Sequence, residues 1–116
     1  MPKKSVASVA QGTPQEPRLV AMEYKGGKKG AAPIVLVGKG ICFDTGGINL
    51  KPHRSMYTMH GDMQGSSVAV GTLLALTRLE ASYPIDCWLA ITENQIGPTA
   101  FRPQEIVHAL NGVSIQ

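Results

Sequence analysis

A short aliphatic run leads directly into a glycine-rich segment, and this pair constrains the fold more than any other part of the chain. Residues 34–37 read Ile-Val-Leu-Val, which predicts a strand that is buried on both faces. Residues 38–52 contain four glycines together with two lysines and an aspartate. Charged side chains in an apolar-walled turn are costly unless something binds there, so we expect a functional turn over residues 38–52.

A strongly apolar helix and further strands accompany this turn. Residues 64–79 predict a helix that is apolar over most of its circumference and is therefore largely buried. Residues 18–24 and 85–91 predict strands, because each is rich in aliphatic or β-branched residues and ends at turn signals. The order strand, helix, strand predicts an α/β fold in which a buried crossover helix joins strands of a mixed sheet.

Length and composition favour one folded domain. The chain has 116 residues, of which 43% are hydrophobic and 16% charged, as expected of a globular protein. Residues 1–17 are polar and predict a tail or a connection, which leaves residues 18–116 for the domain. Near its end, an Asn-Gly pair at residues 111–112 predicts a hairpin over residues 106–115.

Charge and cysteine content exclude several classes of protein. Most of the positive charge lies before residue 30 and lacks the interleaved aromatic residues of a nucleic-acid surface, so we expect a solvated lysine loop. No signal peptide or membrane-length apolar run is visible, so the cytoplasm is the expected compartment and no membrane partner is expected. Cys42 and Cys87 lack metal-binding spacing and are expected to be reduced and mostly buried.

Two carboxylates and two lysines are the side chains best suited to carry chemistry. They are Lys39, Asp44, Lys51 and Asp62. Carboxylate oxygens near a strand end can hold a divalent ion, whereas a lysine binds a metal only after losing its proton. A lysine that stays protonated could stabilise an oxyanion.

Three of these residues also have another interpretation. Asp44 precedes Thr-Gly-Gly and could cap its own backbone in an Asx-turn. Asp62 stands before the predicted helix and could be its N-cap. Lys39 lies between two glycines, but the spacing of a P-loop is absent, so a phosphate-binding βαβ module is a weak alternative.

Two motifs together resemble the leucyl (cytosol) aminopeptidase family of dinuclear metalloexopeptidases. Residues 37–52, VGKGICFDTGGINLKP, are similar to the family signature, and residues 59–65, MHGDMQG, are similar to its Met-x-x-Asp-Met-x-Gly element. The resemblance implies that Asp44 bridges two divalent ions, Zn²⁺ or Mn²⁺, and that Lys39 and Asp62 complete the more exchangeable site. It further implies the following roles: Lys51 as the catalytic lysine that polarises the scissile carbonyl, and Met59 as part of the substrate pocket.

The implied activity is the release of N-terminal residues from peptides, with residues 18–116 as the N-terminal part of the catalytic domain. Intact relatives would assemble as homo-hexamers. The family's Asn-Thr-Asp-Ala-Glu-Gly-Arg motif, which supplies further metal carboxylates, does not occur in these 116 residues. We therefore expect an incomplete and inactive fragment, and the alternative is a non-catalytic truncated or interaction module that retains the fold core.

Overall fold

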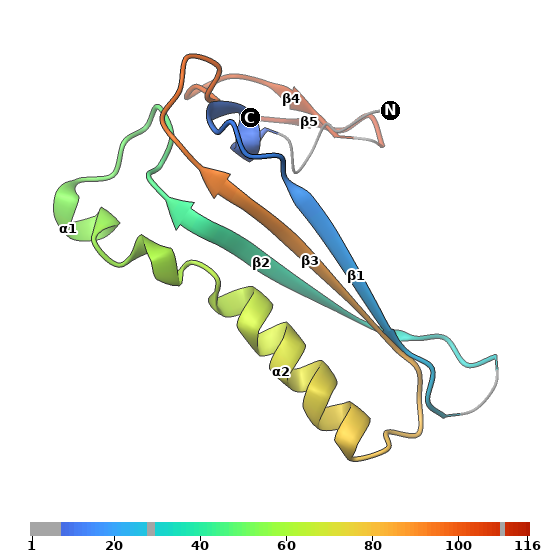
Figure 1. The fold of residues 1–116 in the computed structure, drawn as a ribbon. Coiled ribbons are helices and arrows are strands. Elements are labelled where there is room, and N and C mark those ends of the chain that lie inside the picture. Colours follow the sequence, from blue (N-terminus) through green and yellow to red (C-terminus); the bar gives the residue numbers. More distant parts are fainter. Residues whose placement is uncertain (1–7, 28–29, 110) are drawn as a thin grey trace. The chain divides into compact units, whose positions relative to one another are not determined.

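The computed structural model describes residues 8–27, 30–109 and 111–116 (Figure 1). The part of the predicted polar tail that falls on residues 1–7 lies outside the described residues. In chain order the elements are η1 (Val9–Gly12), β1 (Arg18–Tyr24), β2 (Ile34–Asp44), α1 (His53–Met56), η2 (Met59–Gly61), α2 (Gln64–Arg78), β3 (Ile85–Asn94), β4 (Val107–His108) and β5 (Ser114–Ile115).

The chain forms two compact units, which are described separately. The sheet unit comprises Arg18–Gly40 and Met63–Ile91, and the turn unit comprises Met1–Pro17, Ile41–Asp62 and Thr92–Gln116. Strands β2 and β3 each begin in the sheet unit and end in the turn unit. Within the described residues, no helix is long and apolar enough to cross a membrane.

The sheet has the strand order β1-β3-β2 and mixed strand directions. Strand β1 runs antiparallel to β3, with a register from Arg18 opposite Ile91 to Tyr24 opposite Ile85. Figure 1 shows β2 and β3 running in the same direction, joined through α2. The predicted α/β class with a mixed sheet and a crossover helix is therefore confirmed.

The core of the sheet unit lies between the sheet and α2. It is built on Cys87 and Leu89 of β3 and Ala69 of α2, and partly buried hydrophobic residues from all four elements pack around them. Alternate residues of β3 face this core, as the period of two in a strand requires. Cys87 is fully buried, and burial raises the pKa of its thiol; Cys42 is exposed, so the prediction that both cysteines are mostly buried is wrong for Cys42.

Glycines allow the first turn of α2 to approach β2 closely. A methyl group at Gly38 would lie 2.7 Å from the Cα of Ser66, and one at Gly65 would lie 3.0 Å from the backbone nitrogen of Lys39. Real Cβ atoms essentially never come as close to a backbone atom as 2.7 Å, and 3.0 Å is tighter than most of their contacts, so larger residues at these positions would push the helix away from the strand. Gly38, which suggested a binding turn, therefore also serves helix packing.

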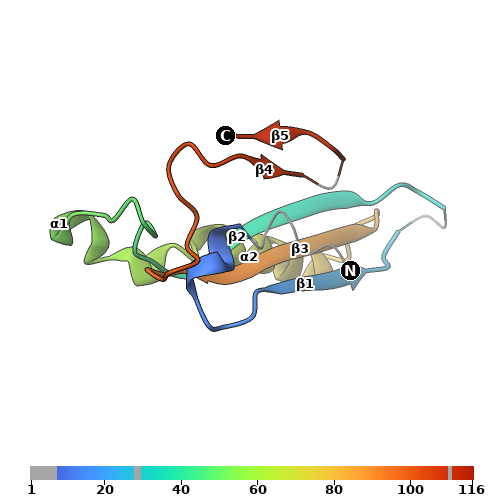
Figure 2. The same cartoon turned by 90° about the horizontal axis from the view of Figure 1, so that it is seen from above.

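Helix α2 is buried along one face only, which differs from the expectation of a largely buried helix. Figure 2 shows it against one face of the sheet. Ser66 and Ala69 are its buried residues, whereas Val68 and Leu74 are exposed, as is Leu79 directly after the helix, to 76%. Apolar residues in the sequence show which helix surface is able to be buried. The described elements of the sheet unit bury only part of that surface of α2.

Two strands are longer than the sequence pattern predicts. Strand β2 continues through the glycine-rich segment as far as Asp44, and β3 continues as far as Asn94. Burial in β2 alternates up to Gly40, but Gly40 and Ile41 are both buried, so the alternation shifts by one residue there. The predicted turn over residues 38–52 is thus a strand for its first half and a turn only after Asp44.

The turn unit contains the predicted hairpin and the segment before β1. Val107 pairs with Ile115 and His108 with Ser114, which confirms the hairpin with strands of only two residues each. Near the N-terminus, the Thr13 hydroxyl donates a hydrogen bond to Glu93 Oε2 at 3.0 Å. The boundary between tail and domain at residue 17 stays a prediction.

Candidate functional site

The turn after β2 is fixed by hydrogen bonds to the end of β3. The Thr45 backbone N–H and the Thr45 hydroxyl both donate to the backbone oxygen of Asn94, at 2.9 and 2.8 Å. The Lys51 N–H donates to the Thr45 oxygen at 2.9 Å and closes the loop. Gly46 and Gly47 have φ values of 89° and 65°, in the left-handed region that favours glycine. The Thr-Gly-Gly sequence is therefore required by the backbone path.

The two carboxylate oxygens of Asp44 have different surroundings. Oδ1 accepts one hydrogen bond from the Gly46 N–H and another from the Asn94 side-chain amide, each at 2.8 Å. Oδ2 lies 3.4 Å from the Lys51 ammonium nitrogen. The bond from Gly46 is an Asx-turn, so the plainer interpretation of Asp44 is correct for Oδ1. It does not account for Oδ2, which remains directed toward a cation.

The surroundings of Asp44 favour its ionised form. Only 8% of the residue is exposed, and this burial by itself raises the pKa of the carboxyl group. The hydrogen bonds from Gly46 and Asn94, together with the positive charge of Lys51, outweigh burial and bring the pKa below its ordinary value. Asp44 is consequently a buried anion whose direction is fixed, which is the state that a metal ligand needs.

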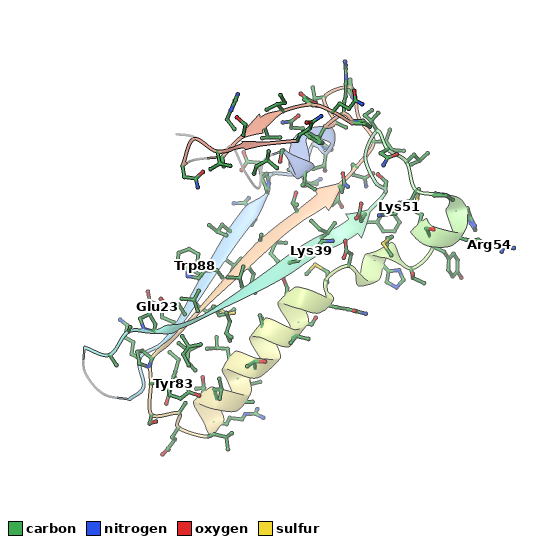
Figure 3. The ribbon with its side chains drawn as sticks, turned by 180° about the vertical axis from the view of Figure 1, so that it is seen from behind. Glu23, Lys39, Lys51, Arg54, Tyr83 and Trp88 are labelled. Carbon is green, nitrogen blue, oxygen red and sulfur yellow. The ribbon has the colours of Figure 1, made fainter. Side chains whose placement is uncertain are left out.

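Lys51 follows the turn, on the loop between β2 and α1 (Figure 3). Its side chain is about one-third exposed, so the ammonium group can contact both Asp44 and a molecule outside the protein. A mobile cation beside a fixed anion can neutralise it, or can turn to stabilise negative charge on a bound molecule.

Asp62 follows the short helix η2 and is connected to β2 through its backbone. The backbone oxygen of Asp62 accepts a hydrogen bond from the Ile41 N–H at 3.1 Å. Its carboxylate oxygen Oδ2 is fully buried. The N-cap position of α2 belongs to Met63, which makes no side-chain cap, so the plainer interpretation of Asp62 as that N-cap does not hold. Burying a carboxylate oxygen is costly, which indicates a role other than capping.

The remaining candidates occupy different places. Met59 is the first residue of η2 in the turn unit and is partly exposed. Lys39 is an exposed residue of β2 in the sheet unit, whereas Asp44, Lys51 and Asp62 all belong to the turn unit. The participation of Lys39 and Met59 in a site stays a prediction. Among the described residues, no three His, Cys, Asp or Glu side chains gather into one metal-binding group.

Asn94 is a residue of the site that is not among those predicted from the sequence. Its side chain contacts Asp44 and its backbone accepts both bonds from Thr45. The signal was present in the strand pattern, because side chains at the carboxyl ends of neighbouring parallel strands meet at one edge of a sheet. Using it would have required the correct ends of both strands, and both were placed too early.

Comparisons with known proteins agree on one family. Residues 2–116 match the family model described as "Cytosol aminopeptidase family, catalytic domain". A probable cytosol aminopeptidase of Pseudomonas syringae pv. tomato is 48% identical over 112 residues, which cover 97% of this chain and 23% of that protein. The chain therefore spans about a quarter of the length of the curated relatives it matches.

Solved structures give the same result. The apo structure of leucyl aminopeptidase from Trypanosoma cruzi has a TM-score of 0.87 and 35% identity, over 96% of this chain and 22% of that one. The bottromycin maturation enzyme BotP in complex with Mn has a TM-score of 0.84 and 33% identity, over 94% of this chain and 23% of that one. By its match along nearly its whole length, this chain belongs to the cytosol aminopeptidase family.

Proposed function

We propose that this chain is the part of a metal-dependent aminopeptidase that supplies some of the metal ligands and the catalytic lysine. Residues 18–116 would be the N-terminal part of its catalytic domain, and the reaction would release N-terminal residues from peptides in the cytoplasm. The observation that carries the proposal is the Asp44 carboxylate, which is buried, ionised and directed by two hydrogen bonds, with a lysine ammonium beside its second oxygen.

The residues present fit a hard divalent ion. Asp44 and Asp62 both offer carboxylate oxygens that are largely withdrawn from water, and such oxygens suit Mn²⁺ and also bind Zn²⁺. Lys39 would add a nitrogen ligand, since a lysine amine binds a metal in its neutral form. When bound, two such ions would supply Lewis acidity and an activated water for attack on the peptide carbonyl. The Mn complex of BotP is consistent with this choice of metal.

Lys51 would act on the substrate. Its ammonium group lies 3.4 Å from Asp44 Oδ2 on a partly exposed side chain, so it can move from that oxygen to a carbonyl oxygen of a bound peptide. A positive charge at that position stabilises the negative charge that develops as the carbonyl is attacked. Met59 would supply apolar surface for the side chain of the N-terminal residue.

The 116-residue chain by itself would not turn over substrate. It offers at most three metal-ligand side chains, Lys39, Asp44 and Asp62, and a pair of ions needs more ligands than that. A non-catalytic interaction module remains the second candidate, favoured by the large exposed apolar surface of α2. Assembly into a homo-hexamer stays a prediction.

A chimaera tests the proposal. The matching 112 residues of the Pseudomonas syringae relative would be replaced by those of this chain, and hydrolysis of a leucine anilide measured with Mn²⁺ or Zn²⁺. We expect the chimaera to be active, its Lys51→Ala variant to lose nearly all activity, and the 116-residue chain alone to be inactive in the same assay. A folded chimaera without activity would favour the interaction module. Turnover by the chain alone that disappears in Lys51→Ala would contradict the prediction of an incomplete site.

A further inference from the structure

Asn94 makes two kinds of contact with the turn that carries Asp44, and they can be separated. Its backbone oxygen accepts the N–H and the hydroxyl of Thr45, which fixes the path of the chain. Its side-chain amide donates to Asp44 Oδ1 at 2.8 Å, which fixes the carboxylate. A substitution at position 94 removes the second contact and leaves the first in place.

The side chain of Asn94 is itself closely confined. A methyl group at Gly47 would lie 3.0 Å from Asn94 Oδ1, so the amide fits against a residue that has no side chain. The amide nitrogen must face Asp44, because its oxygen would repel a carboxylate. Asparagine therefore suits this position, since an aspartate of the same shape would place two negative charges together.

The consequence for Asp44 is an unequal pair of oxygens. Oδ1 receives two donors, from Gly46 and Asn94, which use both of its lone pairs. Two bonds from different segments hold Oδ1 in one place and so keep the Asp44 side chain in one rotamer, whereas the Gly46 bond alone would act as a single pivot. Oδ2 is left toward Lys51, at 3.4 Å from its ammonium nitrogen, and accepts neither of these two bonds.

We infer that Asn94 is a positioning residue, which holds the Asp44 carboxylate so that Oδ2 is presented to a divalent cation. The inference rests on the proposed function for the identity of the ligand, but the orientation of Asp44 can be measured without any metal. Partners that orient a metal ligand typically change metal affinity by 10–100-fold when they are removed. We therefore expect the loss of the Asn94 amide to weaken Mn²⁺ binding by at least about tenfold.

The test compares wild type with Asn94→Leu and Thr45→Val. Asn94→Leu removes the amide donor at similar size, and Asn94→Ala replaces it if leucine does not fit. Thr45→Val is the matched control, because it removes both bonds of the hydroxyl, the 2.8 Å bond to the Asn94 backbone oxygen and the 3.1 Å bond from the Gly47 N–H, and so loosens the same turn without removing a donor to the carboxylate. NMR coupling constants would report whether Asp44 keeps one side-chain rotamer, and calorimetry with MnCl₂ would report affinity.

We expect one Asp44 rotamer in wild type and Thr45→Val, and averaging between rotamers in Asn94→Leu. Mn²⁺ affinity should fall at least about tenfold in Asn94→Leu and less than about threefold in Thr45→Val. A single rotamer in Asn94→Leu, averaging already in wild type, or equal loss of affinity in both variants would overturn the inference. Averaging in Asn94→Leu together with no Mn²⁺ binding by wild type would instead support the positioning role and contradict the proposed metal site.

Discussion

Replacing Gly46 by alanine should destabilise the chain strongly, because the backbone conformation and the packing at this position both oppose a side chain. Gly46 has a φ of 89°, and left-handed backbone costs a residue with a Cβ about 1–2 kcal/mol. The added methyl would also collide with the backbone oxygen of Asn49 and lie 3.0 Å from the nitrogen of Lys51. Both are backbone atoms that cannot rotate away, and such overpacking costs about 1–3 kcal/mol.

The combined loss of about 2–5 kcal/mol is a large share of the total stability of a small domain, about 5–15 kcal/mol. Urea unfolding followed by circular dichroism would measure it, with an unchanged slope showing that the denatured state is the same. Gly61→Ala is the control in the same unit, because nothing lies within 4 Å of the added methyl there. Equal midpoints for the two variants would refute the reasoning, since only strain and collision at Gly46 distinguish them.

Three further predictions concern single side chains. The folded pKa of Asp44 lies below its ordinary value, so Asp44 contributes stability above its unfolded pKa that is lost as pH falls through the folded pKa. Asp44→Asn should therefore weaken the decrease in unfolding free energy with falling pH, as measured by urea unfolding at several pH values. The same decrease in wild type and variant would contradict this prediction. Ser66 Oγ is buried and has no hydrogen-bond partner among the described residues. Ser66→Ala should therefore raise the free energy of unfolding by about 1 kcal/mol relative to Ser67→Ala, the control, which changes an exposed serine of the same helix. Equal effects of the two substitutions would show that the Ser66 hydroxyl is hydrogen-bonded. The exposed apolar surface predicts self-association and dye binding, both reduced by Leu79→Lys; a compact monomer in sedimentation, with a sharp melt and no dye signal, would rule this out.

The sequence predicted the elements whose pattern is local. The bounds of β1 agree at both ends, and α2 ends one residue before the prediction. Alternation and turn signals suffice for such elements because they depend on the chain's own residues. The turn after Asp44 was also predictable, because two consecutive glycines permit the left-handed backbone that Gly46 and Gly47 adopt.

The ends of β2 and β3 were not predictable in this way. Gly38 and Gly40 suggested a turn, but they lie within β2, where they make room for Ser66 of the helix. The sequence alone does not distinguish a glycine that is needed for close helix packing from one that is needed for a turn. Only the segment that packs against the glycine distinguishes the two cases. Asn94 was missed for the same reason, since its importance depends on contact with a residue fifty positions earlier.

The exposed apolar face of α2 has a consequence for the fate of the chain in a cell. Chaperones and proteases recognise aliphatic surface such as that of Val68, Leu74 and Leu79, and they act on partly covered chains continuously. The steady-state amount of this polypeptide should therefore be set by how quickly that face is covered after synthesis. A substitution there would change abundance before it changed any property of the Asp44 turn, so a loss of cellular activity would have to be corrected for protein level before it is attributed to chemistry.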